Sequence, residues 1–389
     1  MGIVHFLKKE LKRVPGMADL LAAQKIAPIV RSPIKKLAGN SKVAISSGQI
    51  AGEVQVVHGP DSRVRYLPQD VAWATDRIFT EAAPAEYPEC FLVRLPDGGV
   101  WDFCTISKEG ALLADVSYEP GLDLATGRNH SFLARRFSPA ATHLEGTAVN
   151  LCTSWAHIAF YHWMIELLPR FSIAKEAGVD LEKATVLVNS LNLPFQRESL
   201  RIFNISRALA ANGLRVSADE MCVPSLAGIT SKPPRWAVDF LRDSFFNGAR
   251  KVTVECPSKI YISRGDTGSR RVLNEVELTA QLARRGFVAM TLSKYHLLEQ
   301  VALFMNASHI VAPHGGGLTN IVFCNAGCRV VELFGPKYVN PCYWSLAELV
   351  GLDYHAEIAP GVREYLYDGP RVADDYEVDV ERVLQAVER

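Results

Sequence analysis

Short apolar runs alternate with segments of helical periodicity between residues 259 and 336, and this alternation constrains the fold more than any other feature of the chain. The segments between the runs repeat apolar residues at helical spacing, as in Val276, Leu278 and Leu282. Strands that alternate with helices of this length predict parallel βαβ units and an open, doubly wound sheet. The predicted strands are Ile260–Ser263, Phe287–Leu292, His309–Ala312 and Arg329–Phe334.

Candidate binding residues follow these strands directly. In open parallel sheets, ligands bind beyond the carboxyl ends of the strands. Arg264 follows the first predicted strand, His314 and three glycines follow the third, and Glu332 lies near the end of the fourth. We therefore expect a ligand site at this edge of the sheet.

The rest of the chain predicts a second α/β unit with a β-rich N-terminal portion. Apolar stretches broken by Pro and Gly between residues 46 and 149 are typical of hairpins, whereas 185–190 predicts a buried strand and 195–205 a helix. We expect the domains to meet in a Pro-rich connector. The predicted division is a basic helical lead-in at 1–45, an N-terminal domain at 46–230, a connector at 231–257 and a C-terminal domain with a terminal helix at 258–389.

The composition excludes several classes of protein. Among 389 residues, 42 basic and 42 acidic side chains cancel, so no net charge favours nucleic acid as a partner. The eight cysteines lack the paired spacing of a zinc site or a disulfide framework, and a reducing cytoplasm suits them best. No apolar run is long enough to span a membrane. The basic start, MGIVHFLKKELKRV, predicts either peripheral contact with an anionic membrane or simply a solvated helix.

Three ionisable residues recur every four positions in the helical segment 154–178. His162, Glu166 and Arg170 therefore share one face, and Pro169 marks a kink or a new helix start. One interpretation is a stripe of surface ion pairs. The other is a functional cluster, which the many aromatic and aliphatic neighbours favour because they leave little room for a polar face.

The loops after the first and third predicted strands are suited to a diphosphate. HGGGLTN, at 314–320, lets the backbone approach a ligand and offers free amides at a helix start. It is neither the dinucleotide fingerprint nor a Walker loop, which argues against NAD and ATP in their usual modes. Arg264, Arg270 and Arg271 add guanidinium groups on the neighbouring loop. Each loop alone is equally well a plain turn or an exposed basic loop, but together they favour a nucleotide diphosphate.

Two further features of this half concern the ribose and the metal. Glu332 could accept hydrogen bonds from a ribose, or could cap a neighbouring helix. No Asp-x-Asp motif stands at a strand end, so a metal-chelated diphosphate is not indicated and the arginines and amides would carry the charge.

The order of these motifs resembles glycosyltransferase family 61. The resemblance rests on YHWMIELLPR at 161–170, YISR with RRVLNE at 261–275, EQ at 299–300, PHGGGLTN at 313–320 and VVEL at 330–333, and covers roughly residues 150–340. Two positions depart from the family pattern: Gly316 stands where Ala is expected, and Ala159 where Asn often precedes the aromatic-His-Trp run.

The resemblance implies a GT-B architecture, in which two Rossmann-like domains with mainly parallel sheets face each other across a cleft. It also implies an inverting, metal-independent transfer from a nucleotide sugar, most simply a UDP-sugar, to a glycan or lipid-linked glycan in capsule, lipopolysaccharide or exopolysaccharide synthesis at the inner face of a membrane. Glu166 is then the first candidate for the base, with His162 orienting it or acting as the base itself. The donor residues are expected to be Arg264, Arg270, Arg271, Asn274, His314, Gly315, Gly316, Gly317, Asn320 and Glu332.

Two other functions fit the same motifs. A non-catalytic nucleotide-sugar-binding or scaffold subunit of a polysaccharide assembly complex would keep the arginine and glycine loops without needing Glu166. A sugar-nucleotide epimerase or hydrolase would use the same grip on the diphosphate but show no dependence on an acceptor.

Overall fold

The computed structural model describes most of the chain after residue 52. The described residues are 53–63, 65, 67–68, 72–119, 130–134, 140–228, 230–362 and 373–388, with the backbone alone at 35–36, 44–45, 64 and 137–138. The basic helix predicted at the N-terminus lies outside them. None of the helices in these ranges is long and apolar enough to cross a membrane.

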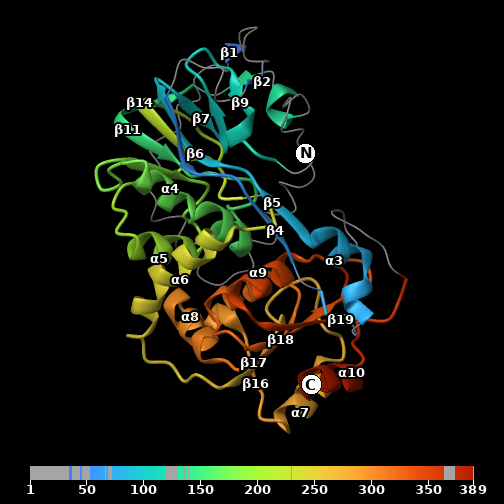
Figure 1. Cartoon of the computed structure of the whole chain (residues 1–389). Coiled ribbons are helices and arrows are strands. Elements are labelled where there is room, and N and C mark those ends of the chain that lie inside the picture. The colour runs from blue at the N-terminus through green and yellow to red at the C-terminus, as the bar shows by residue number, and fades with distance from the viewer. Residues whose placement is uncertain are drawn as a thin grey trace.

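A five-stranded parallel sheet forms the C-terminal lobe, which we define as residues 259–362 and 373–388 (Figure 1). Its strand order is β16–β15–β17–β18–β19, so the chain reverses direction across the sheet between β15 and β17. The strands are β15 (Lys259–Ile262), β16 (Val288–Met290), β17 (His309–Pro313), β18 (Arg329–Phe334) and β19 (Asp353–Ile358). The helices are α7 (Glu275–Ala283), η7 (Leu292–Lys294), α8 (Leu297–Asn306), η8 (Gly316–Phe323), α9 (Cys342–Val350) and α10 (Val380–Glu388).

Helices cover both faces of this sheet. Because side chains alternate along a strand, Ile260 and Ile310 join the core under α8 and α9, whereas Tyr261 and Val311 join the core under α7 and α10. Strands buried on both sides explain the near-continuous apolar runs in the sequence. The parallel α/β sheet predicted for this half is confirmed.

The N-terminal lobe, residues 90–224, contains a mixed sheet. Four parallel strands run in the order β13–β12–β11–β14, and β14 then pairs antiparallel with β6 and β7. We expected a mainly parallel sheet with the β-rich portion beside it. The sheet is mixed because that portion supplies strands to the same sheet, where they complete the hydrogen bonding of β14.

The ten-stranded sheet formed by the described residues combines strands of this lobe with two strands that precede residue 90. The strands are β2 (Ala44–Ile45), β3 (Glu53–His58), β6 (Cys90–Pro96), β7 (Gly99–Trp101), β8 (Cys104–Ile106), β9 (Leu112–Leu113), β11 (Thr142–Asn150), β12 (Thr185–Val188), β13 (Ala208–Ala210) and β14 (Arg215–Pro224), while β1 (Lys35–Lys36) pairs with β10 (Phe137–Ser138) apart from it. The helices are η4 (Ala114–Val116), η5 (Ser131–Ala134), η6 (His162–Leu167), α4 (Arg170–Glu176) and α5 (Pro194–Ile202).

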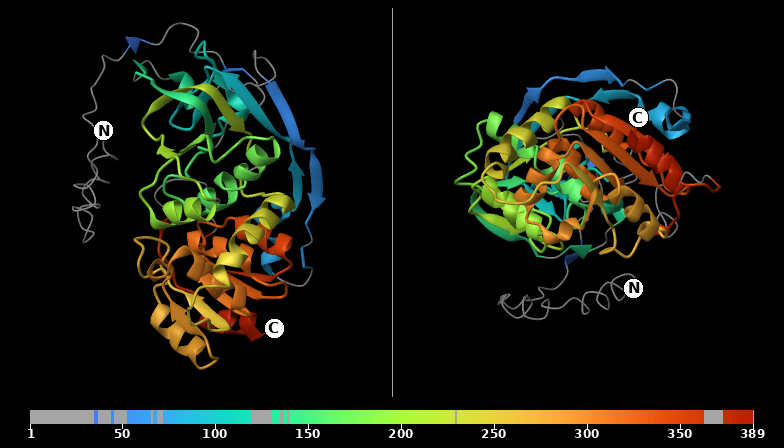
Figure 2. Two further views of the ribbon diagram at one scale, coloured as in Figure 1. Left: turned by 90° about the vertical axis from the view of Figure 1, so that its left-hand side faces the viewer. Right: turned by 90° about the horizontal axis from the view of Figure 1, so that it is seen from below.

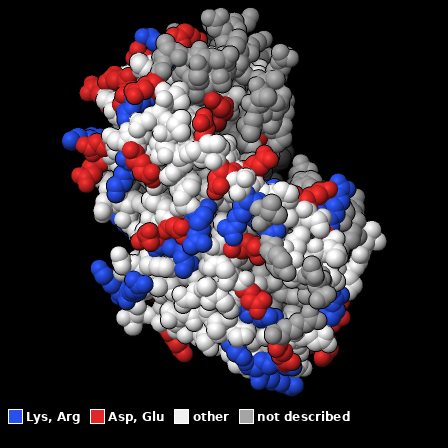
Figure 3. All heavy atoms as spheres, viewed as in Figure 1, with Lys and Arg blue, Asp and Glu red and all other residues white. Residues whose placement is uncertain are grey.

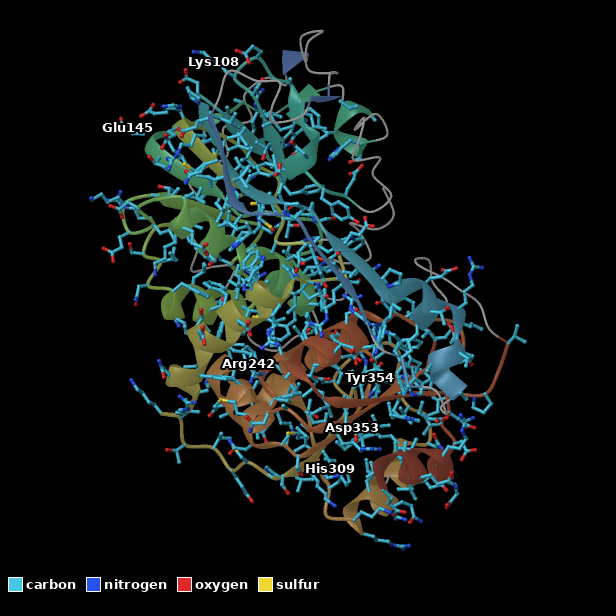
Figure 4. All side chains as sticks on the ribbon, viewed as in Figure 1. Lys108, Glu145, Arg242, His309, Asp353 and Tyr354 are labelled. Carbon is cyan, nitrogen blue, oxygen red and sulfur yellow. The ribbon has the colours of Figure 1, made fainter. Side chains whose placement is uncertain are left out.

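A segment from the N-terminal third crosses to the C-terminal lobe, and we call it the strap (Figure 2). It comprises β3, β4 (Asp61–Val64), η3 (Ala72–Thr75), α3 (Arg77–Ala82) and β5 (Pro84–Tyr87). Trp73 packs edge-on against Tyr354 of β19, with ring centroids 5.3 Å apart, and Phe79 packs against Trp344 of α9 at 5.9 Å. The strap therefore joins the two lobes through aromatic contacts (Figure 4, where Tyr354 is labelled).

Helix α6 (Arg235–Ala249) is the second connection between the lobes. It lies in the predicted connector and packs against α5 and η6 on one side and against α8, η8 and α9 on the other. Arg242 of α6 donates to the carbonyls of Val322 and Cys324, both at 2.7 Å (Figure 4). Because α6 packs against elements of both lobes, it marks no sharp boundary between them. The predicted domain boundaries stay a prediction.

Removing the strap's aromatic anchor should destabilise the protein. We expect Trp73→Ala to lower the free energy of unfolding by about 3–5 kcal/mol, because it opens a cavity between η3 and β19. Urea unfolding followed by circular dichroism would measure the change. The matched control is Val276→Ala, whose side chain is 85% exposed, and which should change the free energy by less than about 0.5 kcal/mol. Equal midpoints for the two variants would contradict this role for the strap.

Candidate functional site

The two lobes enclose a cleft of about 1470 Å³. One wall is the segment 158–162, which leads into η6, together with parts of the strap. The other wall is formed by the loops after β15 and β17 and by residues 338–343. These loops leave adjacent strands toward opposite faces of the sheet, so the cleft lies at the switch point where open parallel sheets bind ligands.

His162 and Glu166 form a hydrogen-bonded pair on the N-terminal wall. The His162 Nδ1 atom lies 2.7 Å from Glu166 Oε2. His162 lines the cleft, whereas Glu166 lies behind it with a side chain only 9% exposed. The other carboxylate oxygen of Glu166 is buried without a hydrogen-bond partner among the described residues. The carboxylate thus fixes the imidazole orientation and leaves Nε2 as the atom available to a ligand.

An unusual helix holds this pair. Residues His162–Leu167 form a π-helix, in which the amide of Leu168 bonds to the carbonyl of Trp163, five residues earlier. Single π turns are frequent at functional sites. Pro169 then caps α4, in agreement with the predicted new helix start.

Arg170 departs from the predicted stripe. It is fully buried and donates to the carbonyls of Cys152, Pro224 and Ser225 instead of pairing with Glu166. Burial lowers the pKa of Arg170 to about 10, which leaves it charged at neutral pH. A buried guanidinium needs several hydrogen-bond acceptors. Arg170 finds them at the carboxyl ends of β11 and β14 and so links these two strand ends.

Arg264 and the glycine turn form the centre of the opposite wall. Arg264 donates from Nε and Nη2 to the carbonyl of Ser269, both at 3.2 Å. A Cβ at position 315 would lie 1.8 Å from Arg264 Nη1, so only glycine permits the guanidinium to lie against this turn. At position 316 the nearest atom to a Cβ would be the Phe160 Cβ at 3.5 Å, which is ordinary contact. The Gly316 that replaces the expected Ala is therefore a mild change.

A second cation reinforces this wall. Arg270 lines the same cleft, and its guanidinium lies over the Tyr338 ring at 5.4 Å. Burial and the nearby charge of Arg270 lower the pKa of Arg264. In the described part of the chain, neither arginine forms an ion pair with a carboxylate. Two neighbouring guanidinium groups without acidic partners favour an anionic ligand.

His314 forms a second pair, with Glu332, beneath the cations. His314 Nδ1 lies 2.5 Å from Glu332 Oε1, and the Tyr354 hydroxyl donates to Glu332 Oε2 at 2.5 Å. Burial holds the pKa of Glu332 well above 4.5. Burial, together with Arg270 and Arg264, holds the pKa of His314 well below 6.5. With Glu332 protonated and His314 neutral, the carboxyl group donates to Nδ1, and Nε2–H of the imidazole is the remaining donor.

The other predicted donor residues divide into two groups. Gly315, Gly316 and Gly317 line the cleft with Arg264, Arg270 and His314. Arg271, Asn274, Asn320 and Glu332 are not among the lining residues.

Each residue of the second group has a partner within the protein. Arg271 pairs with Asp375 through two bonds of 2.6 and 2.9 Å, and Asn274 exchanges hydrogen bonds with the backbone of Val378. These contacts dock the segment 373–379. Glu332 is fully buried, so it reaches a ligand only through His314.

Residues that we had not selected also line the cleft. Gln300 accepts from Asn320 Nδ2 at 3.1 Å and donates to the carbonyls of Leu292 and Tyr295, so it braces η8 from the cleft side. The EQ motif at 299–300 was the signal for it. Tyr338 flanks His314, with ring centroids 5.3 Å apart, and carries no motif that would have indicated it.

Within the residues that the structure describes, no group of three or more His, Cys, Asp or Glu side chains is arranged to hold a metal ion. The eight cysteines are all free thiols. Basic and acidic side chains are interspersed over the face drawn in Figure 3, which agrees with the balanced composition.

Comparison with known proteins gives a family match for part of the chain. Residues 160–331 match the model described as Glycosyltransferase 61, which confirms the resemblance seen in the motifs. The matched segment contains His162, Glu166, Arg264 and His314.

Relatives agree with this match over a shorter stretch. A segment of 94 residues, 22% of the chain, is 38% identical to mouse and to human protein O-linked-mannose beta-1,4-N-acetylglucosaminyltransferase 2 and covers 16% of those proteins. A segment of 97 residues, 24% of the chain, is 35% identical to the EGF domain-specific O-linked N-acetylglucosamine transferase of Drosophila melanogaster and covers 18% of it. The match thus spans about a sixth of the length of these relatives, whose names, with the family match, support a glycosyltransferase enzyme.

The two glycines should respond differently to the same added methyl group. We expect Gly315→Ala to displace the Arg264 guanidinium and to weaken UDP binding about 10- to 100-fold, the equivalent of one or two charge-assisted hydrogen bonds. Gly316→Ala, the matched control, should bind UDP as the wild type does. Isothermal titration calorimetry would compare them, and equal losses in both variants would contradict the contact between Gly315 and Arg264.

The buried Glu332 should make stability depend on pH. The pKa of Glu332 is raised in the folded state. Its stabilising contribution to the free energy of unfolding is therefore complete below pH 4.5, its ordinary pKa, and is lost as the pH rises toward its pKa in the folded protein. Gln at this position stays neutral at every pH. The free energy of unfolding of the wild type minus that of Glu332→Gln should therefore fall by about 1.4 kcal/mol per pH unit above pH 4.5. Urea unfolding of both proteins between pH 4 and 8 would measure it. A difference that grows with pH would show that Glu332 is buried as an anion.

Proposed function

Because residues 160–331 match the glycosyltransferase 61 family, we propose that this protein is an inverting glycosyltransferase of GT-B type. It moves a sugar from a nucleotide diphosphate to a hydroxyl group of a glycan or lipid-linked glycan. The observation that carries the proposal is one cleft with a carboxylate-oriented histidine on one wall and two arginines beside a glycine turn on the other, neither of them ion-paired among the described residues. Such walls suit an acceptor and an anionic donor respectively.

The donor diphosphate binds at the C-terminal wall. Arg264, Arg270 and the free amides at the start of η8 provide positive charge, and His314 adds a donor through Nε2. These groups stabilise the charge that develops as the diphosphate leaves. They supply this charge without a metal ion, so we propose a metal-independent transfer.

His162 acts as the base in this mechanism. Its Nε2 removes the proton from the acceptor hydroxyl while the oxygen attacks the anomeric carbon from the face opposite the leaving diphosphate, which inverts the configuration. Glu166 holds the imidazole and stabilises its protonated form. The family resemblance makes Glu166 the first candidate for the base, whereas the geometry favours His162 because it is the member of the pair that lines the cleft.

The first donor to test is UDP-N-acetylglucosamine, since both relatives are named for N-acetylglucosamine transfer. The polysaccharide setting, a cytoplasmic location and membrane contact through the basic N-terminus stay predictions. The relatives named above are eukaryotic proteins, and their acceptors are stated only for them.

A thermal-shift screen tests the donor site. UDP, GDP, CMP and dTDP are added with and without magnesium to the wild type and to Arg264→Ala. At about 100-fold excess over Kd, binding adds roughly 2.7 kcal/mol to stability, enough to raise the melting temperature visibly. We expect one nucleotide to bind the wild type equally well without magnesium, and Arg264→Ala to lose the shift. A wild type that responds to none of them would contradict the proposal.

His162→Ala should remove the base and leave the donor site intact. We expect kcat for transfer to fall about 10²- to 10⁴-fold with the UDP-induced thermal shift retained. The matched control is His157→Ala, a half-buried histidine five residues earlier that is not among the lining residues, and its kcat should stay near that of the wild type. Wild-type turnover in His162→Ala would assign the cleft to a non-catalytic binding protein.

A further inference from the structure

Two large apolar side chains are exposed at the cleft beside the proposed base. Trp155 is 49% exposed and Ile158 is 59% exposed, and both line the cleft. Ile158 lies in the turn that leads into the helix of His162, four residues before it in the chain. Large apolar groups left exposed in a cleft mark a binding surface more often than a lone surface residue does.

The turn that carries them is held rigidly by buried polar side chains. The Asn189 side chain accepts a hydrogen bond from the Thr153 amide at 3.0 Å and donates one to the Thr153 carbonyl at 2.8 Å. At the other end, Gln196 Nε2 donates to the carbonyls of Ala156 and His157, at 3.2 and 3.3 Å. Both Asn189 and Gln196 are buried, so the turn is fixed before any ligand arrives.

Trp155 adopts a backbone conformation that such residues rarely take. Its φ is 66°, in the left-handed region, and its carbonyl accepts from the amides of Ile158 and Ala159. Strained conformations of this kind persist when the surroundings determine them, and they cluster at functional sites. Here the conformation keeps an indole at the cleft while Ala156, the next residue, is fully buried.

The size of the cleft leaves room for a second substrate. Pockets for a single small ligand are typically roughly 300–1,000 Å³, and this cleft is about 1470 Å³. The arginines and the glycine turn occupy the C-terminal wall, whereas Trp155 and Ile158 lie on the N-terminal wall with His162. The N-terminal wall, which carries His162, therefore also carries two exposed apolar side chains.

We propose that Trp155 and Ile158 form a platform for the acceptor, on which a pyranose ring stacks with its hydroxyl groups directed toward His162. This inference rests on the proposed function and names the chemical class of the acceptor. The C–H groups on one face of a pyranose are apolar and slightly positive, and they complement the negative face of an indole. The hydroxyl groups at the edge of a stacked ring stay free to meet the base.

Saccharide binding to the full chain tests the platform. Saturation-transfer difference NMR is recorded in the presence of UDP with methyl glycosides of glucose, galactose, mannose and N-acetylglucosamine, against the wild type, Trp155→Ala, Trp155→Phe and Ile158→Ser. Val276→Ala controls for loss of an exposed apolar side chain elsewhere. We expect at least one glycoside to bind the wild type, with ring C–H signals strongest.

Trp155→Ala should weaken that binding about tenfold or more, Ile158→Ser by less, and Trp155→Phe should restore most of it. The UDP-induced thermal shift should be the same in all of these proteins. Failure of every glycoside to bind the wild type, with the UDP shift present, would overturn the platform and leave the donor site standing. Loss of the UDP shift in Trp155→Ala would also overturn it, by placing the indole at the donor. Absence of a shift in the wild type with any of UDP, GDP, CMP and dTDP would instead reject the proposed function.

Discussion

The cleft exists because one continuous apolar core joins the two lobes. Side chains of the N-terminal sheet, of α6 and of the C-terminal sheet all belong to it, and Phe245 of α6 contacts both Phe203 and Phe323. The strap adds a second junction at Trp73 and Phe79. Close-packed interiors resist deformation, so these contacts hold the two walls at a fixed separation. Each wall carries only half of the proposed chemistry, and the core sets their distance.

Two histidine–carboxylate pairs occupy the walls, and their surroundings give them different properties. His162 faces the cleft, and Glu166 behind it can stabilise a positive imidazole. His314 lies beneath two arginines, and Glu332 is fully buried, so a positive imidazole there is disfavoured. One pair is thus suited to accept a proton and the other to donate a neutral hydrogen bond. The same residue types suit the two roles that we propose, base and anion binder, because burial and neighbouring charge differ.

Much of the C-terminal lobe could be predicted from the sequence, because its signals are local. A strand followed by a helix repeats within about 30 residues. The glycines after β17 were expected to let a ligand approach the backbone, and the group that the structure shows against Gly315 is the Arg264 guanidinium. The candidate site was less predictable. Arg271 and Asn274 stand in the same loop as Arg264 but bind the segment 373–379, about a hundred residues further along. No local pattern reports a partner so distant.

The sequence by itself determined the parallel sheet, its carboxyl-edge loops and the i, i+4 relation of His162 to Glu166, since periodicity and spacing are properties of adjacent residues. Tertiary structure alone decided which member of that pair faces the cleft, which arginines have no acidic partner among the described residues and why Arg170 is buried under the strand ends. Exposure and pairing depend on what packs across from a residue. In this protein those neighbours come from other elements, brought together only when the two lobes share a core.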